Sequence, residues 1–156
     1  MRAAIRIGVI SDTHGLLRPE AIRALRGCEH IIHAGDVGAR EILEALEAIA
    51  PVTAIRGNID KDACAKRLPE TELIERGGVS IYVLHELAKL DLKPEAVGVR
   101  VVIFGHSHVP KQEMRGGVLY FNPGSAGPRR FRLPITVGEL LIAPGEVSGE
   151  IVKILD

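Results

Sequence analysis

The chain has 156 residues, of which 46% are hydrophobic and 26% are charged, and its 20 basic and 20 acidic side chains cancel. This length and composition predict one soluble globular domain over residues 1–156 with a core of its own. The zero net charge gives no sign of a nucleic-acid-binding patch, and no apolar run is long enough to span a membrane. Two cysteines, Cys28 and Cys64, are too few for a disulfide framework, and the N-terminal apolar run is too short for a signal peptide, so we expect a cytoplasmic protein.

The first half of the chain alternates between strand-like and helix-like segments. Strands are predicted over residues 5–10, 31–33 and 52–56, and helices with apolar residues at helical spacing over residues 19–26 and 41–50. Each of the three strands runs into a polar turn, which contains Asp12, Asp36 or Asn58. This alternation predicts a parallel sheet, in which ligands bind at the carboxyl ends of the strands.

The second half of the chain is rich in strands. We predict strands over residues 80–84, 101–104, 118–121, 135–142 and 147–155, and a short helix or irregular segment over residues 86–97 that Pro94 interrupts. The first two of these strands end at His85 and at Gly105-His106. The pattern favours two sheets packed face to face, with helices outside.

Seven side chains with nitrogen or oxygen donors follow predicted strands: Asp12, His14, Asp36, Asn58, His85, His106 and His108. Such a set without thiolates suits paired divalent metals, and paired metals that hold a phosphate are a recurrent arrangement for phosphoester hydrolysis. Each motif alone has a plain alternative, because Asp-x-His is also typical of a turn and His-x-His of an exposed loop. Taken together, however, all five strands predicted before residue 105 end in Asp, Asn or His, which favours the metal site.

The order of these motifs resembles that of the calcineurin-like metallophosphoesterases. The motifs are Asp12-Thr13-His14, Gly35-Asp36, Gly57-Asn58-Ile59-Asp60, His85, Gly105-His106-Ser107-His108 and Asn122-Pro123-Gly124-Ser125. The short chain and the last motif are similar to the small YfcE-like phosphodiesterase branch. The resemblance implies an α/β fold, a four-layer α/β/β/α sandwich of two mixed β-sheets.

The resemblance also implies the metal site and its chemistry. Asp12, His14 and His108 would bind one divalent ion, Asn58, His85 and His106 a second, and Asp36 would bridge them. A hydroxide that bridges this dinuclear centre would hydrolyse small phosphodiesters. Manganese is the favoured metal, with nickel, cobalt, iron and zinc as alternatives.

Further roles follow from the resemblance or from position. Catalytic roles are expected for Asp36, Asn58 and Asp60, and substrate binding for Asn58 and Arg129. His33 is expected to support the site through its Nδ1–H group. Ile59 stands where many relatives carry a histidine, or a cysteine in the small branch, so the site should favour leaving groups that depart without a proton donor.

One alternative function is a non-catalytic protein-interaction scaffold on the same fold, because the family includes a retromer subunit that has lost part of its metal ligation. The lack of a proton donor at Ile59 favours this alternative slightly, and the complete set of seven candidate ligands argues against it more strongly. By analogy with relatives that assemble, a homo-oligomer, either a dimer or a tetramer, is compatible with the sequence.

Overall fold

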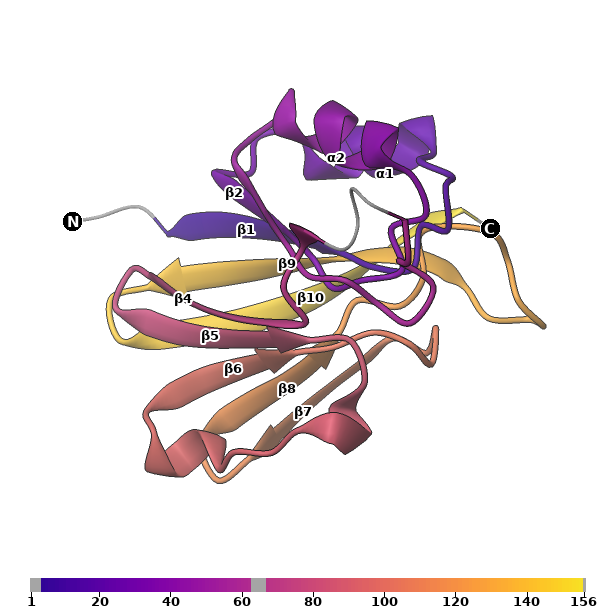
Figure 1. The fold of residues 1–156 in the computed structure, drawn as a ribbon. Coiled ribbons are helices and arrows are strands. Elements are labelled where there is room, and N and C mark those ends of the chain that lie inside the picture. Colours follow the sequence, from indigo (N-terminus) through magenta and orange to yellow (C-terminus); the bar gives the residue numbers. More distant parts are fainter. Residues whose placement is uncertain (1–3, 63–66, 156) are drawn as a thin grey trace.

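The computed structural model describes residues 4–62 and 67–155, so our expectation for Cys64 lies outside the described residues. Ten strands form two five-stranded sheets, with the strand orders β10-β9-β1-β2-β3 and β4-β5-β6-β8-β7 (Figure 1). The first sheet and its helices comprise β1 (Ile5–Ile10), α1 (Pro19–Leu25), β2 (His30–His33), α2 (Arg40–Glu47), β3 (Val52–Ala54), β9 (Ile135–Ala143) and β10 (Glu146–Leu155). The second comprises β4 (Thr71–Arg76), β5 (Val79–Leu84), the 3-10 helices η2 (Leu87–Lys89) and η3 (Pro94–Ala96), β6 (Val99–Ile103), β7 (Lys111–Arg115) and β8 (Val118–Asn122).

Both sheets are mixed, and their inner faces share one core. Strands β1, β2 and β3 run parallel, as do β5, β6 and β8, whereas β9, β10, β4 and β7 pair antiparallel with their neighbours. Between the sheets, fully buried side chains such as Ile7, Ile81 and Phe121 belong to a single hydrophobic cluster. Burial of this apolar surface against both sheets is the main force that holds them face to face.

The outer faces of the two sheets are covered differently. Helices α1 and α2 pack on the first sheet through a second cluster that includes Leu25, Ile31 and Leu46. On the second sheet, Tyr82 and Val102 are covered by leucines of the segment 87–92, next to the short helix η2. The expected α/β/β/α sandwich is therefore confirmed, with an outer layer of 3-10 turns on one side because Pro94 and Gly98 leave no room for a long helix.

Two strands of the structure were not predicted from the sequence. Strands β4 and β7 are edge strands made largely of polar, exposed residues, so they lack the apolar alternation of a half-buried strand. The five strands predicted before residue 105 are each followed by a candidate ligand, and the structure adds a sixth strand, β4, that is not. The predicted strand over 52–56 and helix over 41–50 also end early, at Ala54 and Glu47.

The sandwich brings the carboxyl ends of the parallel strands of both sheets to one rim. A side-chain carbon added at Gly35, after β2, would lie 2.7 Å from His85 Nδ1, after β5. One added at Gly105, after β6, would lie 2.2 Å from Ser11 Oγ, after β1. The predicted ligands therefore meet where the two sheets meet. Within residues 4–62 and 67–155, no helix has the length and apolar character needed to cross a bilayer.

Candidate metal centre

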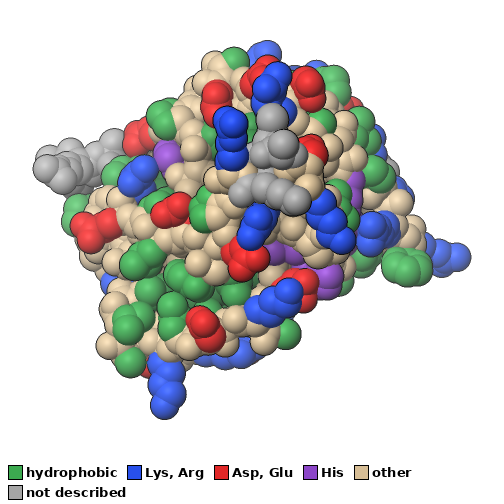
Figure 2. Space-filling view, in the orientation of Figure 1, with side chains coloured by type: hydrophobic (Ala, Val, Ile, Leu, Met, Phe, Trp, Pro, Cys, Tyr) green, Lys and Arg blue, Asp and Glu red, His purple; other side chains and the backbone are tan. Residues whose placement is uncertain are grey.

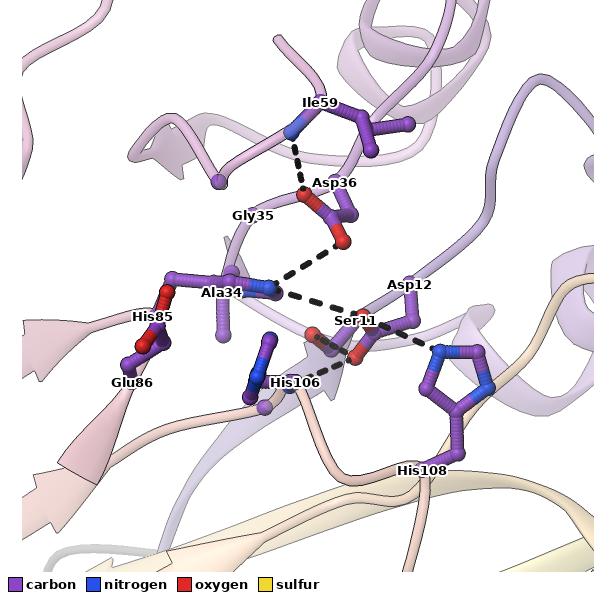
Figure 3. A network of polar contacts seen from close by, with 12 residues as sticks. Ser11, Asp12, Ala34, Gly35, Asp36, Ile59, His85, Glu86, His106 and His108 are labelled. Carbon is purple, nitrogen blue, oxygen red and sulfur yellow. Dashed lines mark hydrogen bonds and ion pairs between the residues drawn. The ribbon is translucent and has the colours of Figure 1, made fainter. Parts of the chain in front are cut away.

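Asp12 lies at the centre of the site. Its carboxylate is fully buried, and Oδ1 lies 3.4 Å from His108 Nε2 and 3.7 Å from both His14 Nε2 and His85 Nε2 (Figure 3). The other oxygen, Oδ2, accepts hydrogen bonds from Ser11 Oγ at 2.7 Å and from the backbone N–H of His106 at 3.1 Å. One oxygen is thus fixed by the protein, and the other faces three imidazole nitrogens.

Asp36 occupies the position between two of these histidines. Its Oδ2 lies 3.2 Å from His85 Nε2 and 3.6 Å from His14 Nε2, and its Oδ1 accepts the backbone N–H of Ile59 at 3.1 Å. In Figure 3 the Asp36 carboxylate points from the 35–36 turn toward His85. An oxygen between donors from both halves of the site is the arrangement that a bridging ligand requires.

His85 is held in the tautomer that a metal ligand needs. Its Nδ1 lies 2.7 Å from the carbonyl oxygen of Ala34, which can only accept a hydrogen bond, so Nδ1 carries the proton. In the neutral ring the lone pair of Nε2 then faces Asp12 and Asp36. Burial opposes the charged ring, but the contacts with Asp36 and Asp12 outweigh it and raise the His85 pKa.

Asn58 completes this side of the centre. One arm of its amide lies 3.2 Å from Asp36 Oδ2, 3.3 Å from Asp36 Oδ1 and 3.2 Å from His85 Nε2. With its nitrogen in that arm, Asn58 donates hydrogen bonds to these acceptors. With its oxygen there, four lone-pair donors face one another, an arrangement that a cation between them would stabilise.

The chemistry of the donor set fits divalent cations. Two groups of three described residues have donor atoms within 4.8 Å of one another, namely Asp12, His14 and His108, and Asp12, Asp36 and His85. Among the described residues, the buried Asp12 Oδ1 and His14 Nε2 have no hydrogen-bond partner. Burial disfavours the Asp12 carboxylate, but contacts with His108 and His14 outweigh it and lower the pKa of Asp12, so the cation-binding form is present at neutral pH.

The grouping differs from the expected ligand sets, because Asp12 belongs to both groups and Asp36, the expected bridge, to one. His106 belongs to neither; its side chain is exposed, and its ring meets the His85 ring edge-on with centroids 5.3 Å apart. This ring lies beside the second group, so its role as a ligand stays a prediction.

Backbone conformation sets the ligands apart from the rest of the chain. Six described non-glycine residues have a positive φ, and five of them are predicted ligands: Asp12, His14, Asp36, His106 and His108. Left-handed conformations are unfavourable for such residues and persist where the surrounding structure enforces them, often at functional sites. The turns after the strands thus aim the side chains into the rim.

Asp60 and His33 support the ligand turns. Asp60 is buried, and its carboxylate accepts the backbone N–H groups of Gly57 at 2.8 Å and of Val37 and Gly38 at 3.1 Å. It therefore ties the Asp36 turn to the Asn58 turn, which is a positioning geometry; the catalytic role expected for Asp60 stays a prediction.

For His33 the expected Nδ1–H contact is wrong. Its Nδ1 accepts the N–H of Gly35 at 3.1 Å, and its Nε2 lies 3.0 Å from Thr13 Oγ1, whose proton goes to Val37. Burial lowers the pKa of His33 to about 4, so the ring is neutral.

The motif Asn122-Pro123-Gly124-Ser125 also holds ligand loops. The Asn122 amide donates to Gly105 O at 3.1 Å and to Ser107 Oγ at 3.2 Å, and Ser125 Oγ donates to Asp12 O at 3.1 Å. This short turn therefore links the loops that carry His106, His108 and Asp12. Arg129 donates from Nη1 to Leu133 O at 3.1 Å, and its expected substrate role stays a prediction.

A cleft of about 550 Å³ opens beside Asn58 and His85. Figure 2 shows purple histidine surface on this face, surrounded by charged side chains. The other polar residues that line the cleft are Arg56, Glu70, Thr71, Tyr82, Glu86, Lys89 and Asp91. Its volume and polar lining suit a small, hydrophilic ligand next to the candidate ligands.

The family of the chain follows from a comparison of its sequence with models of known protein families. The sequence model described as the calcineurin-like phosphoesterase superfamily domain matches residues 5–148, a range that includes all seven predicted ligands. The chain belongs to this family. It is 38% identical, over 132 residues, to a probable metallophosphoesterase of Methanocaldococcus jannaschii, a match that covers 76% of this chain and 67% of that protein.

Two further comparisons give a relative in sequence and a neighbour in fold. The phosphodiesterase YfcE of Escherichia coli K12 is 31% identical over 156 residues, which cover 83% of this chain and 84% of that protein. The structure of Vps29 from Chaetomium thermophilum superimposes with a TM-score of 0.77 at 19% identity, over 96% of this chain and 97% of that one, which shows a shared fold. The family is metal-dependent, and its named relatives support a phosphoesterase.

Proposed function

We propose that the chain is a dinuclear metal-dependent phosphodiesterase that hydrolyses small phosphodiesters. The observation that carries the proposal is the position of Asp12 Oδ1 and Asp36 Oδ2, each of which faces His14 and His85 from within 3.7 Å. Two carboxylate oxygens that share two histidines resemble the framework of a two-metal site.

The residues of the chain would act mainly by position. Asp12, His14 and His108 would hold one ion, Asn58, His85 and His106 the other, and Asp36 would bridge them. When bound, the two ions would supply charge that activates water and stabilises the phosphoryl group in an in-line displacement.

Asp60, through the backbone N–H groups of Val37, Gly38 and Gly57, would keep the Asp36 and Asn58 turns in register with each other. Arg129 would attract the substrate phosphate.

Ile59 shapes which esters the site would cleave. Its backbone N–H holds Asp36, while its side chain, 41% exposed, has no proton to give to a leaving group. Substrates whose leaving groups depart as stable anions would therefore react faster than alkyl esters.

Three further properties belong to the proposal. Manganese is the metal we favour, because the oxygen and imidazole donors suit it and the set lacks a thiolate. The cytoplasm is the proposed location, in keeping with the buried free thiol of Cys28. A homo-oligomer is compatible with the exposed edge strands β7 and β10.

The test is hydrolysis of bis(p-nitrophenyl) phosphate by metal-stripped protein, titrated with Mn²⁺, Ni²⁺, Co²⁺ and Zn²⁺ while bound metal is counted. Turnover that saturates near two ions per chain is the expected result. Asp36→Ala should lose both metal binding and turnover, whereas Glu146→Ala, an exposed carboxylate on β10, should keep both. An active, metal-replete Asp36→Ala variant would refute the proposal.

The same titration addresses the scaffold alternative, which the shared fold with Vps29 keeps in view. Two bound ions without turnover of any phosphodiester would point to a site disabled at Ile59. No bound metal would favour the scaffold.

A further inference from the structure

The loop between β8 and β9 has an unusual tip. Phe131 is 93% exposed and has a φ of +54°, a left-handed conformation that is rare for an aromatic residue. Residues 128–132 are all exposed, and a turn from Arg130 O to Leu133 N closes the tip. A large apolar ring held in water by a strained backbone is a candidate for contact with a ligand.

The same loop concentrates positive charge. Arg129, Arg130 and Arg132 surround Phe131, and residues 123–138 contain no acidic side chain. A fourth arginine, Arg18, donates from Nη2 to Gly127 O at 3.2 Å at the base of the loop. In a chain whose total charge is zero, this local excess is a site of attraction for anions.

The base of the loop is fastened to the turn that carries Asp12. Ala126 N–H donates to Ser11 O at 3.1 Å, and Ser125 Oγ donates to Asp12 O at 3.1 Å. At the other end of the loop, Thr136 N–H donates to Ser125 O at 2.9 Å, so both ends are held together. The arginine-rich loop therefore starts from the metal centre itself. It projects beyond the ends of the strands in Figure 1, and in Figure 2 blue side chains lie along the edge beside the histidines.

We propose that residues 128–132 form a recognition site for the nucleoside part of a nucleotidyl phosphodiester. In this site Phe131 stacks on the base, and the arginines attract its phosphates. The inference rests on the proposed function and specifies its substrate class. The zero net charge of the chain does not argue against such a site, because the charge that a single nucleotide would meet is local.

A ligand that contains both a base and a phosphodiester explains the composition of this loop better than a ligand with only one of the two. Arginines suffice for a simple phosphate ester, and an exposed Phe then has no role. An aromatic ring flanked by guanidinium groups matches a ligand with a π face and negative charge, and stacking of this kind tolerates any base.

The test compares two substrates with the same leaving group, p-nitrophenyl thymidine 5′-phosphate and methyl p-nitrophenyl phosphate. With the metal-loaded full chain, Phe131→Ala should raise KM for the thymidine ester about 5- to 150-fold, the range for loss of one stacked base. The KM for the methyl ester should stay unchanged. Phe131→Leu, apolar but not aromatic, should behave like Phe131→Ala, and Phe131→Tyr should restore the wild-type KM.

Equilibrium dialysis of thymidine 5′-monophosphate gives a readout independent of turnover, and the Phe131→Ala chain should bind it correspondingly more weakly. Equal changes on both esters, or none, together with unchanged dialysis, would overturn the inference while leaving a demonstrated phosphodiesterase intact. If no ester is turned over, the proposed function fails and dialysis alone decides the inference. Retention on anionic phosphatidylserine vesicles that depends on Phe131, without a base effect, would also overturn it and assign the loop to a membrane surface.

Discussion

The sharpest test of the site geometry is Gly57→Ala, which adds one carbon beside Asp36. That carbon would lie 2.1 Å from Asp36 Oδ1 and 2.4 Å from Asp36 N, whereas real contacts of this kind essentially never fall below 3.0 Å. To reach 3.0 Å, Gly57 must separate by about 0.9 Å from Asp36 Oδ1 and by about 0.6 Å from Asp36 N. Because one of the two atoms is backbone, a new rotamer of Asp36 cannot relieve the contact.

A displacement of about 1 Å at a catalytic centre typically costs about 100-fold in rate, and we expect that loss in kcat/KM on bis(p-nitrophenyl) phosphate, with fewer bound metal ions. Gly117→Ala is the control, since its added carbon meets nothing within 4 Å, and its positive φ of +81° costs stability far from the rim. Melting temperatures of both variants separate folding from site effects. A Gly57→Ala variant with parental kcat/KM and metal content would refute the geometry that places Asp36 in the site.

Three further predictions concern residues around the ligands. Ile59→His should raise rates by up to about 100-fold on esters with poor leaving groups and little on p-nitrophenyl esters, measured over a leaving-group series; an equal gain on all would count against the proton-donor argument. Asp60→Asn places an NH₂ group among the three backbone donors of the loops, so urea unfolding should show a loss of about 1–3 kcal/mol, and an unchanged stability would contradict the positioning role. Burial lowers the His33 pKa to about 4, against about 6.5 in the unfolded chain, so the stability that the neutral ring contributes is complete above pH 6.5 and is lost as the pH falls toward 4. Between pH 7 and 4.5 the metal-free chain should therefore lose about 2 kcal/mol more than His33→Gln, and parallel urea profiles would show that the ring is not buried as a neutral base.

Much of the fold could be predicted because the buried strands carry strong local signals. Strand β1 is apolar and ends at a polar turn, and its predicted bounds match those of the structure. Strands β4 and β7 could not be found in this way, because an antiparallel edge strand takes its conformation from the neighbour with which it pairs and has few buried side chains. The thin outer layer over β5 and β6 also depends on tertiary contacts of leucines that have no clear helical spacing.

For the site, spacing in the sequence identified residue types but not their partners. The structure brings donor atoms of Asp12, Asp36, His14, His85 and His108 near one another, and their role as metal ligands stays a prediction. That Asp12 belongs to both groups could not be predicted from the sequence. It depends on how close the turn after β1 lies to the second sheet. The supporting hydrogen bonds of Asp60 and Asn122 likewise join segments that only the packed sandwich brings near.

The left-handed turns have a consequence for how the centre would be loaded. These turns are held by backbone hydrogen bonds of their own, such as Asp12 N–H to Gly35 O at 3.0 Å and His14 N–H to Asp36 O at 2.9 Å. Because backbone hydrogen bonds hold these turns, the candidate ligands would keep their orientation whichever divalent ion they bind. Such a centre can exchange one divalent ion for another without refolding, so the metal it carries in a cell would follow supply as much as affinity.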